Sequence, residues 1–238
     1  MRSRNVIDMH LVNRMQAFGW PLFAVTIAFM VILAVGLIVR SQGGEAQAGM
    51  YEGMEWNGAI FALLGPLIGY GFTSMGQYFP LALGLGLTRR EFAAGVSAVF
   101  LGNAVIYSVL ITIGKTIERA TEGFGLRIRF FDVFYTGTGS SWQTLVQTFL
   151  LILAVLFLGA AITAAFQRFG QAFLWLSAAA LALIGLGVLA GVVFLDGFGR
   201  ALLDVLTMGW GPWMGVIAVI GALSAGVWLM LVRRTQVR

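Results

Sequence analysis

The sequence predicts an all-α integral membrane protein with six transmembrane helices, and three observations carry this prediction. Of the 238 residues, 59% are hydrophobic and only 11% are charged, whereas a soluble domain usually carries about 25% charged residues. The mean hydropathy is +0.90. The charged residues gather in short turns between long uncharged runs, one of which extends from Phe92 to Gly114. We therefore expect a single transmembrane domain covering 1–238.

Each expected span is a run of about 20 apolar residues, the length that crosses about 30 Å of hydrocarbon. The first run begins near Trp20 and is longer than the apolar core of a cleavable signal peptide, so we expect it to be retained. Six runs meet the length requirement, at 20–39, 57–79, 92–114, 144–166, 172–195 and 212–232.

The distribution of basic residues predicts that both termini are cytoplasmic. With this orientation the inner segments have a formal charge of about +7 and the outer loops about −2, which add to the +5 of the chain. Short cytoplasmic segments of membrane proteins are enriched in Lys and Arg, so the basic charge needs no nucleic-acid partner. Arginine outnumbers lysine 14 to 1, and we expect a multi-pass protein of a bacterial cytoplasmic membrane, in contact with membrane lipids.

Segment 5–18 is predicted to be an amphipathic helix on the inner membrane surface. Ile7, Leu11, Met15 and Phe18 share one face at steps of four, four and three, as in an interfacial helix. Anchoring and contact with a partner remain alternative uses of this helix. The opposite face carries His10, Asn13, Arg14 and Gln16, with Val6 and Met9 lying near it as exceptions.

A charged elbow joins the second expected span to the third. Thr88-Arg-Arg-Glu91 fits a capping box, in which the Thr side chain accepts from the Glu backbone N–H and the Glu side chain reaches back. The third span is therefore expected to begin as a helix in the cytoplasm. Leu85 and Leu87 would keep the corner against the bilayer. Two interpretations stay open: a capped helix end with two positive-inside arginines, and a docking surface for a partner.

The residues that the chain lacks exclude several kinds of chemistry. There is no cysteine, and His10 is the only histidine, so neither thiolate chemistry nor a metal site is expected. The expected spans contain no Asp, Glu, Lys, Arg or His, which argues against a proton relay through the membrane. The mild polar residues of the spans either line a path for an amphipathic cargo or hydrogen-bond between helices. They are Tyr70, Gln77, Asn103, Tyr107, Gln147 and Gln167.

Two outer segments are predicted to lie at the headgroup boundary. In 115–141, Arg127 and Arg129 alternate with apolar residues, which favours an interfacial segment over the alternative of an outer gate. The segment 196–210 is expected to form a short amphipathic helix that dips into the outer leaflet. Small-residue pairs that allow close helix approach occur at Gly65/Gly69, Gly187/Gly191 and Gly211/Gly215.

In this layout the chain resembles the permease subunit of an ATP-binding cassette (ABC) transporter of the multidrug, lipid and polysaccharide export type. That group includes small lantibiotic-immunity and bacitracin-resistance permeases. The N-terminal helix, the six spans and the elbow carry the resemblance, and only the elbow sequence Leu-Gly-Leu-Thr-Arg-Arg-Glu-Phe at 85–92 is motif-like.

The resemblance implies an export subunit for an amphipathic, lipid, peptide or drug-like substrate. A separate ATPase subunit would bind ATP and Mg, a second permease subunit would complete a homodimer or heterodimer, and this chain would hold no cofactor and catalyse no reaction itself. The implied contacts with the ATPase are Thr88, Arg89, Arg90, Glu91 and Phe92, with Arg14 and His10 secondary. The alternatives are a membrane scaffold or assembly factor that transports nothing, and a passive channel.

Overall fold

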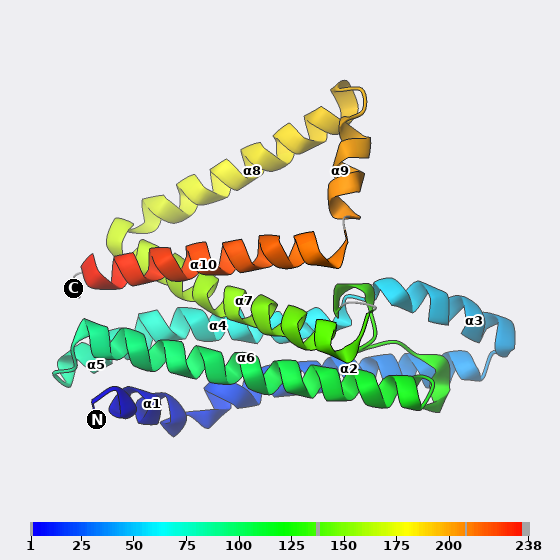
Figure 1. Cartoon of the computed structure of the whole chain (residues 1–238), viewed down its shortest axis with the longest axis horizontal. Coiled ribbons are helices and arrows are strands. Elements are labelled where there is room, and N and C mark those ends of the chain that lie inside the picture. Colours follow the sequence, from blue (N-terminus) through cyan, green and yellow to red (C-terminus); the bar gives the residue numbers. More distant parts are fainter. Residues whose placement is uncertain (1, 137–138, 208, 235–238) are drawn as a thin grey trace.

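The computed structural model describes residues 2–136, 139–207 and 209–234, and all the regular elements within these ranges are helices. Six of them are long and apolar enough to span a membrane, which confirms the predicted fold class (Figure 1). Arg238 and the side chains of Arg2, Arg4 and Leu11 lie outside the described residues. The six spanning segments are Met15–Arg40, Ala59–Gly84, Arg89–Ala120, Ser141–Phe169, Gln171–Phe194 and Trp210–Arg234.

The spans are built mainly from long α-helices. The second span is the exception, because it combines a 3-10 segment (Ala59–Leu63), two α-helices and a turn of π-helix (Ser74–Tyr78). A second π-helical turn, Met15–Gly19, opens the first span. The α-helices are α1 (Arg2–Val12), α2 (Trp20–Arg40), α3 (Gly44–Gly53), α4 (Leu64–Thr73), α5 (Phe79–Gly84), α6 (Arg89–Ala120), α7 (Ser141–Phe169), α8 (Gln171–Phe194), α9 (Phe198–Leu206) and α10 (Trp210–Arg234).

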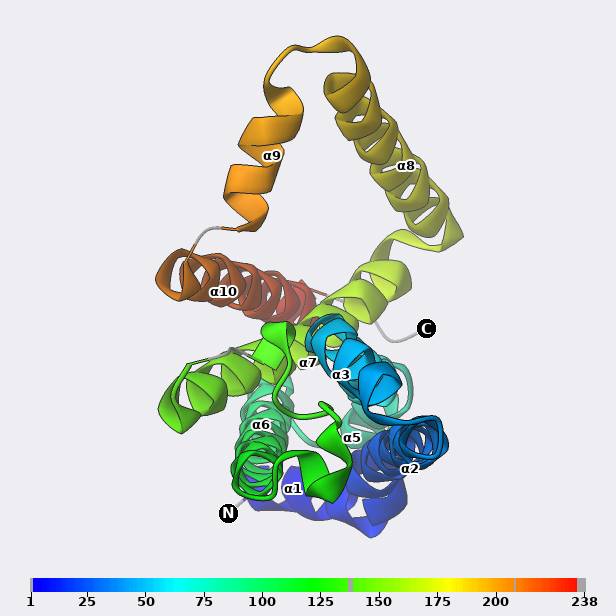
Figure 2. The ribbon, with the colours of Figure 1, turned by 90° about the vertical axis from the view of Figure 1, so that its right-hand side faces the viewer.

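Helix α7 lies at the centre of the bundle, where it contacts α4, α6 and α10 (Figure 2). It meets α4 at two glycines. A Cβ on Gly71 would lie 2.5 Å from the carbonyl oxygen of Leu156, and one on Gly159 would lie 2.5 Å from that of Ile68. Helices in lipid associate through such close backbone approach, so these two glycines set the α4–α7 distance.

The glycine pairs singled out in the sequence do not make this contact. A Cβ added to Gly65, Gly69, Gly187, Gly211 or Gly215 would have no neighbour within 4 Å among the described residues, and Gly191 faces the ring of Phe198. Glycines four residues apart allow a close approach, but the approach also requires a second helix that packs against that side of the glycines.

Helices α8 and α9 form an arm that leaves the bundle at Gly170 and returns to it at α10 (Figures 1 and 2). Gly170 has a φ of +75°, a conformation that glycine adopts without strain, and it is the single residue between α7 and α8. Among the residues of α8, Gly191 alone is buried. The predicted short helix after the fifth span is present as α9.

A helix is present in the predicted region, but α1 ends at Val12 where the prediction ran to Phe18, and its completely buried residues are not on the predicted apolar face. Val6 and His10 are completely buried against the bundle, and Met15 of the predicted apolar face is 56% exposed. Val6 and His10 are four residues apart and so lie on one side of the helix, which packs against α6. The hydropathy pattern did not indicate this face, because one of its two completely buried residues is the polar His10.

We predict that Gly71→Ala destabilises the bundle, because the new methyl group has no space against the α7 backbone. Overpacking of this kind costs about 1–3 kcal/mol, and it would appear as a lower midpoint of thermal unfolding in detergent. Gly69→Ala in the same helix is the control: its Cβ meets open space, and Ala favours the helix over Gly. Equal loss of stability in both variants would contradict the close-approach assignment.

Candidate functional site

The elbow between α5 and α6 is a rigid corner. Helix α5 ends in a Schellman motif, in which Leu87 N–H donates to Ala82 O at 3.0 Å and Gly86 N–H donates to Leu83 O at 3.0 Å. Gly86 supplies the positive φ of +76° that this motif requires. Thr88, the N-cap of α6, follows two residues later, so the connection between the two helices is short and held by hydrogen bonds at both ends.

The predicted capping box is confirmed at the start of α6. The backbone N–H of Glu91 donates to Thr88 Oγ1 at 3.2 Å, and the backbone N–H of Thr88 donates to Glu91 Oε2 at 2.8 Å. The Thr88 hydroxyl also donates to the same carboxylate oxygen at 2.8 Å. The first turn of α6 is therefore held closed by its own side chains.

The elbow is tied to the far end of the chain by Arg89. Its Nη1 donates to Arg233 O at 2.7 Å and to Val232 O at 3.4 Å, where a cation is favoured by the free carbonyls of a helix C-terminus. Phe92 is completely buried and its ring lies 5.1 Å from that of Phe79. The elbow thus contacts α5 through Phe92 and α10 through Arg89.

The remaining predicted coupling residues differ in accessibility. Arg90 is exposed on the outside of the corner, beside Leu85, which is 67% exposed. Arg14 is exposed as well, whereas His10 is completely buried. The structure therefore corrects the assignment of His10: its side chain contacts the interior of this chain and is out of reach of a partner at the surface.

His10 belongs to a buried group that we call the N-terminal polar cluster: His10, Gln16, Tyr70, Thr73 and Tyr78. His10 Nδ1 lies 2.7 Å from Tyr70 Oη, and its ring centroid is 4.2 Å from that of Tyr78. The Tyr78 hydroxyl donates to Gln16 Oε1 at 3.3 Å, and Gln16 Nε2 donates to Thr73 Oγ1 at 3.3 Å. These bonds fasten α1 and the first π-helical turn to the second span.

The N-terminal polar cluster brings a histidine against the second span, although the sequence predicted no titratable Asp, Glu, Lys, Arg or His within the spans. Tyr70 is near the middle of the second span, so His10 reaches deep into the bundle although no expected span contains a histidine. Burial lowers the pKa of His10 to about 4, and its imidazole is neutral at pH 7. His10 Nε2 is buried without a hydrogen-bond partner among the described residues.

Three of the predicted path residues instead join segments of the chain. Tyr70 binds His10, as described above. The Tyr107 hydroxyl donates to Phe18 O at 2.7 Å, and Gln147 Nε2 donates to Tyr135 O at 2.7 Å. For these residues the structure favours the second of the two uses that the sequence left open, which is hydrogen bonding between segments.

Gln167 has a similar role at the π-helical turn of the second span. Its Nε2 donates to Met75 O at 2.8 Å, a carbonyl within the irregular turn Ser74–Tyr78. Asn103 is completely buried and donates to Val99 O of its own helix at 2.9 Å. Gln77 is exposed, and Gln147 and Gln167 are half-buried.

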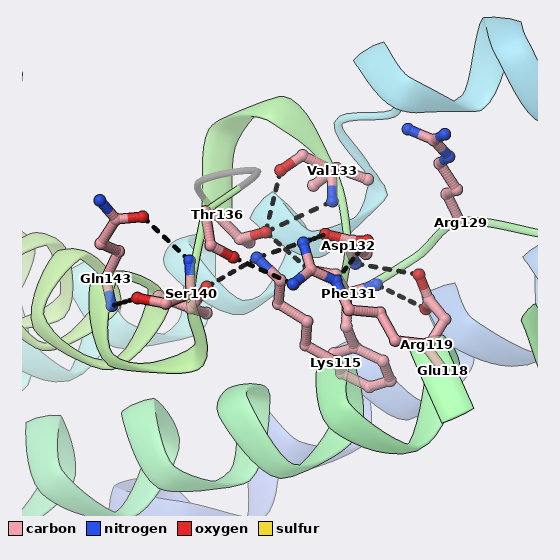
Figure 3. A network of polar contacts seen from close by, with 12 residues as sticks. Lys115, Glu118, Arg119, Arg129, Phe131, Asp132, Val133, Thr136, Ser140 and Gln143 are labelled. Carbon is pink, nitrogen blue, oxygen red and sulfur yellow. Dashed lines mark hydrogen bonds and ion pairs between the residues drawn. The ribbon is translucent and has the colours of Figure 1, made fainter. Parts of the chain in front are cut away.

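A second polar group, the outer polar network, lies at the opposite end of α6: Lys115, Glu118, Arg119, Asp132 and Thr144 (Figure 3). Lys115 is completely buried, and its Nζ donates to Thr144 Oγ1 at 2.7 Å and lies 3.3 Å from Asp132 Oδ1. Arg119 binds both oxygens of Asp132, through Nε and Nη2 at 2.8 Å each. The network joins α6, α7 and the loop between them.

Glu118 folds that loop back onto α6. Its carboxylate accepts from the backbone N–H groups of Phe130 and Phe131 at 3.0 and 2.8 Å, and from that of Asp132 at 2.9 Å.

The pKa of the Asp132 carboxyl is lowered by its partners in the outer polar network. Burial raises this pKa, but the hydrogen bond and charge of Arg119, together with the charge of Lys115, outweigh burial and hold it below its usual range.

The chain between Glu118 and Phe130 takes an unusual backbone path. Three residues other than glycine have a positive φ, namely Glu122 (+50°), Phe124 (+56°) and Arg127 (+52°). Such conformations cost of the order of 1–3 kcal/mol each and persist where the surroundings impose them. Here the ring of Phe124 packs on that of Phe29 at 5.1 Å. We call this stretch, 122–127, the left-handed turn.

Sequence reasoning did not find the outer polar network. A signal was present, because Lys115, Glu118 and Arg119 recur at the i, i+3 and i+4 positions of one helix face. The acceptors of Glu118 are backbone N–H groups, however, and these leave no trace in a sequence.

No family model, curated protein or solved structure matches this chain. The fold and composition define it as a multi-pass helical membrane protein.

We predict that the docking of α1 depends on pH through His10. Undocked His10 titrates near its ordinary pKa of about 6.5, and docked His10 titrates at about 4. Docking is therefore fully favourable above the higher value and weakens as the pH falls through it. A spin label on the exposed residue Asp8, introduced as Asp8→Cys, should become more mobile at pH 5 than at pH 7.

His10→Phe is the control for this measurement. Since His10 is the only histidine of the chain, the variant should lose the response to pH between 7 and 5. An identical response in the variant and the parent would show that another group is responsible.

We also predict that Asp132→Asn lowers the free energy of unfolding more than the double change Lys115→Met with Asp132→Asn. The single change leaves the Lys115 ammonium buried without its carboxylate, a loss of about 3–5 kcal/mol, and the double change removes both charges. Denaturation of the purified protein in detergent measures the difference. If the double variant were the less stable of the two, the pair would not act as a buried ion pair.

Proposed function

We propose that this chain is the membrane-spanning permease subunit of an ABC exporter in a bacterial cytoplasmic membrane. ATP and Mg would be bound by a separate ATPase subunit. The observation that carries the proposal is the elbow: a short corner closed by the Schellman motif of Gly86 and the capping box of Thr88. A partner that moves such a corner moves the attached helices with it.

In the proposed mechanism, ATP binding closes the ATPase subunits and displaces the elbow. Arg90 and Leu85 form the accessible surface of the corner. Arg89 passes the movement to the end of α10, and Phe92 passes it to α5 through Phe79. Because α6 and α10 both pack on α7, the helices would shift as a group.

A second permease subunit is part of the proposal. Helix α8 has large apolar side chains exposed on every side, Trp175, Leu176, Ile184 and Leu189 among them at 60–70%. Lipid alone can cover such a helix, but a second subunit beside α8 would also explain why the arm stands away from its own bundle. The cargo would be amphipathic, a lipid, a peptide or a drug-like compound.

We predict that a stoichiometric ATPase subunit copurifies with the tagged chain in mild detergent and that Arg90→Glu releases it. Arg90 is exposed, so its charge reversal should leave the midpoint of thermal unfolding unchanged while the affinity for the ATPase falls about a hundredfold or more. Reversing a charge that contacts a partner costs several kcal/mol, and each 1.4 kcal/mol is a factor of ten. Mass spectrometry of the purified material quantifies the partner.

Arg200→Glu is the matched control. Arg200 is an exposed arginine on α9, and Figure 1 shows α9 at the opposite end of the molecule from the elbow. This variant should retain the ATPase. If no ATPase copurified although the membrane complex stayed intact in detergent, the exporter proposal would be contradicted, and a scaffold or a passive channel would be favoured. Equal loss in both variants would remove the elbow from the interface.

A further inference from the structure

The outer end of α6 borders a cavity that the proposed export mechanism does not use. Its volume is about 410 Å³, within the range of about 300–1,000 Å³ of small-molecule sites. An adjoining hollow of about 540 Å³ shares Glu122 and Arg127 with it and adds Arg40. The left-handed turn is thus the wall between the two spaces.

The cavity lies at the level of the lipid headgroups in the membrane. The uncharged run of α6 ends at Gly114, and the last helical residue, Ala120, is five residues beyond Lys115, a rise of about 7.5 Å. The headgroup layer on each side of the hydrocarbon is about 5–8 Å thick. Arg40 ends the apolar helix α2, which places its guanidinium beside the cavity at the same boundary.

The charged groups of the lining fall into two sets. Glu118, Arg119 and Asp132 are engaged in the outer polar network, and Arg129 lies 3.6 Å from Glu55 and 4.3 Å above the ring of Tyr51. Figure 3 shows Arg129 extending toward α3, away from that network. The second set is exposed and has no partner in the described part of the chain: Glu52, Glu122, Arg40 and Arg127.

Two further observations point to a ligand. Arg129 lines the cavity and its side chain is 22% exposed, so part of this cationic group is open to a ligand. The left-handed turn also holds Glu122 and Arg127 in place, because a Cβ on Gly123 would lie 2.4 Å from Ile128 O and Gly125 N–H donates to Thr121 O at 2.9 Å. The backbone that carries Glu122 and Arg127 therefore has a defined conformation.

We propose that this cavity binds the headgroup of a zwitterionic phospholipid that carries a phosphate and a primary amine. The amine fits between the carboxylates of Glu52 and Glu122. The phosphate fits the guanidinium groups of Arg40 and Arg127, since guanidinium groups bind phosphate well. The acyl chains lie along the exposed apolar side of α2, where Leu37 and Ile38 are 59% and 60% exposed.

The test uses the full-length chain, purified with its bound subunits, stripped of lipid and titrated with single lipids by native mass spectrometry. Phosphatidylethanolamine should bind about tenfold more tightly than phosphatidylglycerol, which lacks the amine, because one charge-assisted interaction is worth about a factor of ten. The pair Glu52→Gln with Glu122→Gln should abolish this preference. The pair Arg40→Gln with Arg127→Gln should weaken both lipids about tenfold.

Arg200→Gln with Asp204→Asn on α9 is the control for the loss of outer charges, and it should bind both lipids as the parent does. Equal affinity for the two lipids, or unchanged binding in both cavity variants, would overturn the proposal. Soluble phosphoethanolamine should compete with the lipid for the site. If it bound while phosphatidylethanolamine did not, the occupant would be a soluble amine-phosphate compound, and the lipid assignment would be wrong.

Discussion

The bundle depends on the close contact between α7 and the helices around it. In a bilayer the lipid tails are as apolar as the side chains, so helices associate through backbone approach, van der Waals contact and hydrogen bonds. Gly159 allows α4 to approach α7, and small residues continue along the buried side of α7 at Ala160, Ala161 and Ala164. Helix α7 therefore fixes where α4, α6 and α10 lie, and the elbow and both polar groups take their positions from those three helices.

The number of spans and the capping box at Thr88 were predictable from the sequence. Both depend on residues that are neighbours along the chain: a long uncharged run must cross the bilayer, and a box needs only Thr88 and Glu91 three positions apart. The alternation of Arg127 and Arg129 with apolar residues marks the buried side of its segment, since Ile128 and Phe130 are completely buried, whereas its predicted place at the headgroup boundary stays a prediction. The function of the elbow was predicted from a resemblance and remains a proposal.

What the sequence did not predict depends on contacts between distant residues. His10 is buried because Tyr70, 60 residues away, supplies a hydrogen bond, and no local pattern distinguishes such a histidine from an exposed one. Glu118 binds backbone N–H groups of a loop, and backbone groups are the same in every sequence. The glycines that matter, Gly71 and Gly159, are 88 residues apart, whereas a search for small-residue pairs looks only four residues ahead.

The position of α1 has a consequence for the order in which the protein is assembled. A chain is synthesised from its N-terminus, so α1 leaves the ribosome before the spans that it packs against, and Tyr70, the partner of His10, follows it by 60 residues. Until the second and third spans have entered the bilayer, Val6 and His10 have nothing to pack against. Helix α1 can therefore reach its final position only after the second and third spans are in place, although it is made before them.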